Sequence, residues 1–111
     1  MNVRFEEHGT LCVVSLDGEM VGESVDSVRR ACLERLQSGI RDLILDVSTT
    51  VLVDSAGLEA MLDLADATNE RHGRCMLAAP DDAFRSVLQI TRLHERLEIH
   101  AAVDAAARTI R

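Results

Sequence analysis

A carboxylate, a hydroxyl and a glycine lie close together in the segment VLVDSAGLEAML (residues 51–62), between an apolar run and a helix-like pattern. Ser55 stands where a loop from a buried strand is expected to enter a helix. Unpaired backbone N–H groups and the positive end of the helix dipole surround such a position. The simplest interpretation is therefore that Ser55, or Asp54 before it, caps the helix.

Two features of this segment favour a further role. The residue three positions after Ser55 is Leu58, whereas a capping box would have Glu or Gln there. Gly57 in the first helical turn costs about 1 kcal/mol relative to Ala, which indicates a purpose such as the close approach of another backbone or of a ligand. We therefore expect a surface that a partner contacts.

Enzymatic uses of Ser55 have little support in the sequence. A serine hydrolase places its nucleophile in G-x-S-x-G, but Val53 stands two residues before Ser55. The four histidines lack short metal-ligand spacing with the cysteines, so we expect no metal and no cofactor. A phospho-aspartate receiver domain uses a late lysine, and this chain contains no lysine. The sequence predicts a protein that is not an enzyme.

Length and charge limit the possible partners. A chain of 111 residues with 47% hydrophobic residues predicts one globular domain over residues 1–111. The net charge of -7 argues against nucleic acid and anionic membranes, and it favours a partner that carries arginine or lysine. Three widely spaced cysteines within apolar patterns predict reduced core thiols in a cytoplasmic protein. The acidic surface favours a monomer when free.

Hydrophobic spacing predicts the elements that position Ser55. Residues 3–16 predict a β-hairpin around Gly9, and residues 24–38 predict a helix with Ser24 as its N-cap. The apolar run at 43–47 predicts a central parallel strand. A second helix over 55–72 follows, then a strand at 75–80, a helix capped by Asp81, a strand at 97–100 and a terminal helix over 102–110. The order predicts an α/β fold, with a mixed sheet and helices packed largely on one face.

In this register, LILDVSTTVLVDSAGLEAML (residues 43–62) resembles the STAS family, specifically its single-domain anti-sigma factor antagonists. The family pattern is an apolar strand with Asp-Leu-Ser-Gly-Val, then Asp-Ser-Ser-Gly-Leu opening a helix. Thr49 replaces the usual glycine and Ala56 the usual second serine. The segments VVSLDGEM and 84–110 also resemble the family, so the likeness covers nearly the whole chain. The residues that match the central motif are Asp46, Ser48, Asp54, Ser55, Gly57 and Leu58.

The resemblance implies that Ser55 is a phosphoacceptor in a partner-switching pathway. The unphosphorylated protein would bind a GHKL-type serine kinase that is itself the anti-sigma factor, and a PPM-type serine phosphatase would restore binding. Asp54 would orient the Ser55 hydroxyl or meet an arginine of the kinase, with helix capping as the alternative. The expected partner-binding residues are Asp54, Ala56, Gly57, Leu58, Asp46, Ser48, Gly18 and Glu19.

Alternatives remain open at several of these positions. Asp46 is equally suited to forming a turn, and Leu58 to packing in the core. The residues Ser48, Thr49 and Thr50 are nearby fallback phosphoacceptors. At the level of the whole protein, the alternative is a non-switching accessory subunit of a lipid-transporting ABC ATPase complex, because STAS domains also resemble such subunits.

Overall fold

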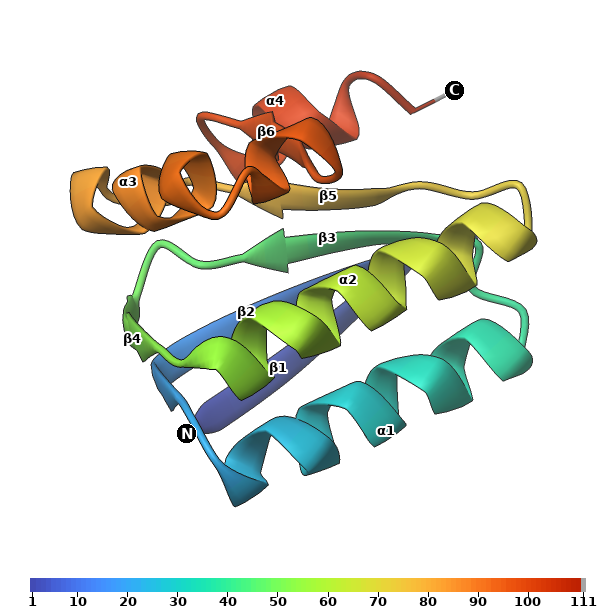
Figure 1. Cartoon of the computed structure of the whole chain (residues 1–111). Coiled ribbons are helices and arrows are strands. Elements are labelled where there is room, and N and C mark those ends of the chain that lie inside the picture. Colours follow the sequence, from blue (N-terminus) through green and yellow to red (C-terminus); the bar gives the residue numbers. More distant parts are fainter. Residues whose placement is uncertain (111) are drawn as a thin grey trace.

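The computed structural model describes residues 1–110 (Figure 1). Strands and helices alternate along most of the chain. The elements are β1 (Asn2–His8), β2 (Leu11–Met20), α1 (Glu23–Gln37), β3 (Asp42–Asp46), β4 (Thr50–Val53), α2 (Ser55–Glu70), β5 (Cys75–Ala78), α3 (Asp82–Ile90), a 3-10 turn (Leu93–Glu95), β6 (Glu98–His100) and α4 (Val103–Ala107).

The mixed sheet predicted from the sequence is confirmed. Its order is β1-β2-β3-β5-β6, with β1 antiparallel to β2 and the other neighbours parallel. The long strand β2 changes partner along its length, because its first half pairs with β3 and its end pairs with β4. A register shift between Gly18 and Glu19 accompanies this second pairing. The strand β4 was not predicted, since its residues were interpreted only as an apolar run before the helix.

Alternate side chains of the central strands face two apolar layers. One face carries Cys12, Val14, Leu43, Leu45 and Leu77, which join the core formed with α1, α2 and α3. Figure 1 shows α1 and α2 lying side by side across the sheet. The opposite face is smaller and packs against α4 through Val13, Ile44, Met76, Ala78 and Ala106. The helices therefore lie largely on one face, as predicted.

The helix ends confirm one predicted cap and correct another. Asp81 caps α3 as predicted, because its Oδ1 accepts a hydrogen bond from the Phe84 N–H at 2.8 Å. The prediction that Ser24 caps α1 is wrong. The N-cap is Gly22, and the Ser24 hydroxyl instead donates to the Val21 carbonyl at 2.6 Å. Gly22 makes no side-chain cap, and its φ of 56° is a left-handed conformation that a serine at this position would reach only with strain.

The three cysteines Cys12, Cys32 and Cys75 are free and buried, as predicted for core thiols. Burial raises the pKa of Cys32 and of Cys75 to about 12, and it also raises that of Cys12. Because the thiolate is the reactive form, we expect the folded protein to resist a disulfide-exchange reagent at mildly alkaline pH. Thiol titration should give three fast-reacting groups only in guanidinium chloride. Fast labelling of the folded protein would contradict this packing.

No helix within residues 1–110 is long and apolar enough to cross a membrane.

Candidate functional site

Three aspartates lie at or just after the carboxyl ends of the parallel strands β3, β4 and β5. Asp46 ends β3, Asp54 follows β4, and Asp81 lies three residues after β5. The carboxyl ends of parallel strands meet at one edge, so this edge carries negative charge. Ser55 is exposed at the same edge as the first residue of α2. In Figure 1, β4 leads directly into α2 at this point.

Asp54, and not Ser55, caps α2. Its Oδ1 accepts from the Gly57 N–H at 2.9 Å, and its Oδ2 accepts from the Gly22 N–H at 3.0 Å. Its own backbone N–H donates to the Met20 carbonyl at 3.3 Å. One side chain therefore joins the start of α2 to the turn before α1. Among residues 1–110 the Ser55 hydroxyl makes no hydrogen bond, so it is free to react or to meet a partner.

These two N–H donors, Gly57 first and then Gly22, hold the pKa of the Asp54 carboxyl below its usual value. A carboxylate with a lowered pKa in the folded state contributes stability above its ordinary pKa, and this contribution is lost as the pH falls through the folded value. We expect Asp54→Ala to lower the urea midpoint at neutral pH. The gap from the wild type should close below about pH 4.

Asp54→Asn is the matched control, because it keeps one acceptor oxygen and should retain part of the stability. Urea titrations of the wild type and both variants across the acid range measure the effect. Equal midpoints for the wild type and Asp54→Ala at every pH would show that the two hydrogen bonds of Asp54 do not stabilise the fold.

Gly57 is buried, and its lack of a side chain is required by its neighbours. A Cβ atom at this position would lie 2.7 Å from the Met20 carbonyl oxygen and 2.9 Å from Val53 Cγ1. Of the two predicted purposes, close approach of another backbone or of a ligand, the structure shows the first, and that backbone belongs to the same domain. Gly57 thus acts inside the domain, where it lets α2 start against the end of β2. Leu58 is partly buried and packs against the core.

The loop between β3 and β4 is shaped by side chains that the sequence singled out. Asp46 Oδ1 accepts from the Ser48 N–H at 3.0 Å, so Asp46 forms a turn. Ser48 and Thr49 are exposed. Thr50 is buried, and its hydroxyl donates to the Leu16 carbonyl at 2.6 Å, which removes it from the accessible hydroxyls.

Gly18 and Glu19 lie beside this loop at the end of β2. The Gly18 N–H donates to the Thr49 carbonyl at 3.1 Å, and Gly18 adopts φ 107°, which favours glycine. Glu19 is exposed and pairs with Leu52 of β4. The fold therefore brings all the predicted site residues to one end of the molecule, although Gly57 lies beneath its surface.

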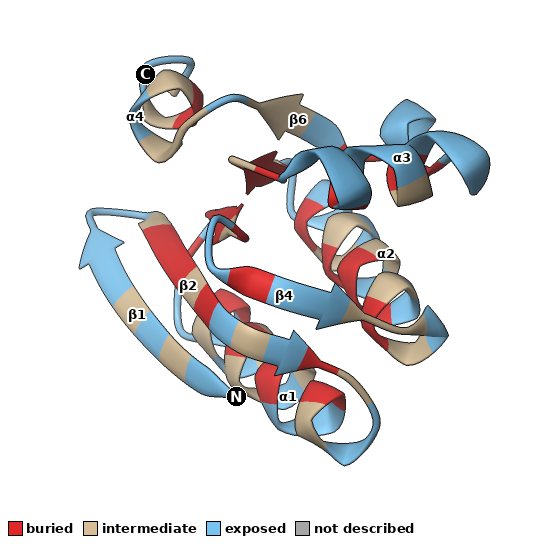
Figure 2. Cartoon of the chain, turned by 90° about the vertical axis from the view of Figure 1, so that its left-hand side faces the viewer, coloured by how far each residue is buried: buried red, intermediate tan, exposed pale blue. Residues whose placement is uncertain are grey.

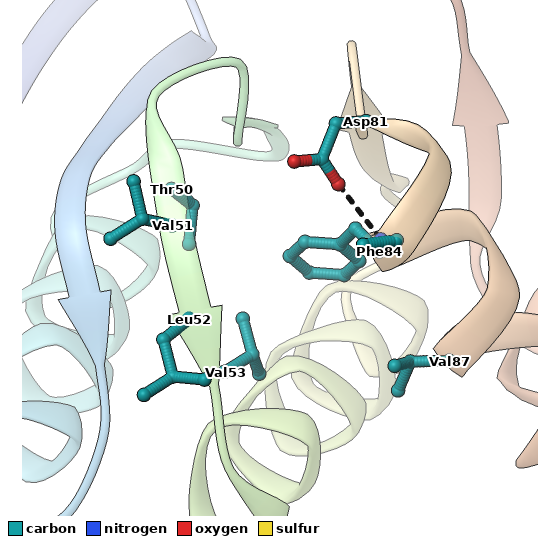
Figure 3. Close-up of a pocket in the computed structure, with 8 residues that line it drawn as sticks. Thr50, Val51, Leu52, Val53, Asp81, Phe84 and Val87 are labelled. Carbon is teal, nitrogen blue, oxygen red and sulfur yellow. Dashed lines mark hydrogen bonds between the residues drawn. The ribbon is translucent and has the colours of Figure 1, made fainter.

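Sequence reasoning missed the apolar surface of β4. Val51 is 75% exposed and Leu52 is 51% exposed, and Figure 2 shows the exposed middle of this strand beside its buried start. A cavity of about 110 Å³ lies between β4 and α3, with Phe84 and Val87 on the helix side (Figure 3). The available signal was the run of three successive apolar residues before the Asp54 cap, because a strand buried on one face only would alternate apolar and polar residues.

The site offers an exposed hydroxyl, small neighbouring side chains and an apolar strand. Nothing within residues 1–110 groups three His, Cys, Asp or Glu side chains closely enough to hold a metal ion. Ala56, next to Ser55, has a small and partly buried side chain. This side chain therefore does not shield the Ser55 hydroxyl from a macromolecule. Such a surface is suited to contact with another protein.

Comparison with known proteins gives a family and a fold. A family model of the STAS domain matches residues 2–106. The structure is similar to that of a Thermotoga maritima protein described as a candidate anti-sigma factor antagonist, with TM-score 0.92, 16% identity, and coverage of 97% of this chain and 93% of that chain.

Two further solved structures are those of SpoIIAA. The anti-sigma factor antagonist SpoIIAA in its unphosphorylated form has TM-score 0.84 and 20% identity, covering 97% of this chain and 96% of that chain. The Bacillus cell fate determinant SpoIIAA in its phosphorylated form has TM-score 0.78 and 21% identity, covering 97% and 99%. At these identities the likeness shows the fold. Comparison with curated proteins finds no match.

Proposed function

The chain belongs to the STAS domain family, and we propose that it is an anti-sigma factor antagonist controlled by phosphorylation of Ser55. In its unphosphorylated form it binds a GHKL-type serine kinase that acts as the anti-sigma factor. Phosphorylation of Ser55 releases the kinase, and a PPM-type serine phosphatase restores binding. The chain itself is a substrate and a switch.

The observation that carries this proposal is the free hydroxyl of Ser55. Asp54 satisfies the cap of α2, so the helix does not need the serine. The side chain is exposed, and an enzyme can reach it without opening the fold. A structurally similar antagonist has been solved in a phosphorylated form, which supports a phosphorylatable site on this fold.

The position also suits a phosphate electrostatically. A phosphoserine carries roughly -1.5 to -2 charge at neutral pH, and the N–H groups and dipole at the start of α2 favour an anion there. The domain is therefore expected to stay folded when Ser55 is phosphorylated. What changes is the contact surface, where a small hydroxyl becomes a strongly hydrated dianion beside Asp54.

The acidic residues around Ser55 favour a partner surface that carries positive charge. Asp46, Asp54 and Asp81 lie around the site, together with the exposed Glu19 at the end of β2. A partner surface with arginine or lysine would associate with this edge faster than a neutral one, and a new phosphate would alter the charge balance of the contact.

A displacement experiment tests the proposal. Unphosphorylated protein is added to a preformed complex of the cognate GHKL-type kinase and its sigma factor, and the products are separated by size-exclusion chromatography. We expect free sigma factor and a new complex of kinase with this protein. If the kinase-sigma complex persists with excess protein, the antagonist function is wrong for that pair.

A further inference from the structure

The cavity between β4 and α3 lies one residue from the cap of α2, and we call it the β4–α3 pocket. Val51, Leu52 and Val53 line it from β4, and Ala83, Phe84 and Val87 line it from α3. Figure 3 shows Val53 and Val87 pointing toward one another across its lower part. Since β4 continues directly into Asp54 and Ser55, a partner that covers Ser55 is positioned to reach this pocket as well.

Two of the apolar residues that line the pocket are strongly exposed to solvent. Val51 and Leu52 are 75% and 51% exposed, although solvent-facing positions of a short edge strand are ordinarily polar. Adjacent exposed apolar side chains beside a cavity mark a place where another molecule binds. The volume of about 110 Å³ corresponds to roughly four water molecules, which suits one branched aliphatic side chain.

One acidic residue lines the pocket, and two more lie near its lining residues. Asp81 lines the pocket, and its Oδ1 is held by the Phe84 N–H at 2.8 Å. Asp82 is exposed next to it, and Glu19 of β2 is the strand partner of Leu52 of β4. Arg85 lies on the same helix but does not line the pocket, and its Nε donates to the Pro80 carbonyl at 3.2 Å. The rim therefore complements a basic residue next to the inserted side chain.

We propose that the β4–α3 pocket receives a leucine- or isoleucine-sized side chain of the kinase partner, flanked by an arginine that pairs with the acidic rim. This rests on the proposed function and adds a second anchor to it. The Ser55 surface is sensitive to phosphate, whereas the pocket holds the partner through apolar burial. A small set of buried anchors commonly supplies most of the energy of such an interface.

Two variants block the pocket by different means. Ala83→Trp fills it with apolar bulk from an exposed position in the first turn of α3, and Leu52→Asp places a charge on its wall. The control is Ile90→Asp, because Ile90 is 82% exposed on the same helix and does not line the pocket. Urea unfolding of each variant verifies the fold before binding is measured.

Calorimetric titration against the cognate GHKL-type kinase gives the outcome. We expect roughly thirtyfold weaker binding for Ala83→Trp and for Leu52→Asp, the effect of losing one anchor side chain, and unchanged binding for Ile90→Asp. Suppose that both blocked variants bind the kinase with wild-type affinity while Ser55→Asp still loses binding. This result would overturn the proposal that the pocket receives a side chain of the kinase, and it would leave the proposed function intact.

Two other outcomes also overturn the proposal. If the unphosphorylated wild type binds no cognate kinase, the proposed function fails and the pocket assignment fails with it. If sedimentation shows that the wild type self-associates and that only this association is lost in Ala83→Trp, the occupant of the pocket is a second copy of the chain.

Discussion

Phosphorylation of Ser55 is expected to weaken kinase binding by about a thousandfold, which corresponds to ~4 kcal/mol. The loss has a local cause. The kinase would have to remove water from a dianion at a contact that otherwise buries a hydroxyl beside Ala56. The start of α2 stabilises the phosphate in the free protein, so the penalty falls on the complex and not on the fold.

Calorimetry with the purified phosphoprotein and the unphosphorylated protein measures this ratio. Ser55→Ala is the matched control and should bind like the unphosphorylated protein, because its methyl group adds no charge. Circular dichroism of the phosphoprotein should retain the helical signal. Binding within a factor of about three of the unphosphorylated protein, a difference below 1 kcal/mol, would show that the phosphate does not control the contact.

Gly57→Ala is expected to destabilise the protein by about 1–2 kcal/mol, although helix propensity alone predicts a gain of about 1 kcal/mol. The added Cβ would lie 2.7 Å from the Met20 carbonyl oxygen, and a backbone atom cannot rotate away. Val53 Cγ1 blocks the other side at 2.9 Å. The start of α2 must therefore move away from the end of β2, which also strains the Asp54 cap.

The sign of the change in the free energy of unfolding decides this prediction. Urea denaturation of the wild type and Gly57→Ala supplies it. Ala56→Gly in the same turn adds no atom that could clash, and it should lose at least about 0.5–1 kcal/mol from helix propensity and from a methyl group that packs partly against the core. If Gly57→Ala proved more stable than the wild type, the close approach of α2 to Met20 would not be the reason for glycine at this position.

Local sequence patterns predicted two kinds of element correctly. In the first kind the stabilising contacts join residues close in sequence, and in the second kind the residues form a continuous apolar run. The hairpin around Gly9, the buried run at Leu43–Val47 and the Asp81 cap could all be predicted from a few neighbouring residues. The helix that starts at Ser55 was predicted for the same reason. Its last two predicted residues lie beyond Glu70, because the chain turns there: His72 adopts a left-handed φ of 60°, and the Gly73 N–H donates back to the Thr68 carbonyl at 2.8 Å.

The remaining features depend on contacts between distant segments. The strand β4 exists because β2 extends past the end of β3 and offers Gly18–Met20 as a new partner. The second hydrogen bond of Asp54, from the Gly22 N–H, joins residues 32 positions apart in sequence, and no local pattern indicates it. The pocket needs both β4 and α3. Sequence reasoning therefore singled out the segment around Asp54 and Ser55 but did not give the exposed apolar surface beside it.

The central claim is that Ser55 is the phosphoacceptor of this chain. The purified protein is incubated with the cognate GHKL-type kinase and Mg-ATP, and its intact mass is recorded and mapped by peptide fragmentation. We predict one phosphate on the wild type, located on Ser55, and none on Ser55→Ala. A phosphate on Ser48 or Thr49, or no phosphate with any cognate kinase, would contradict the account.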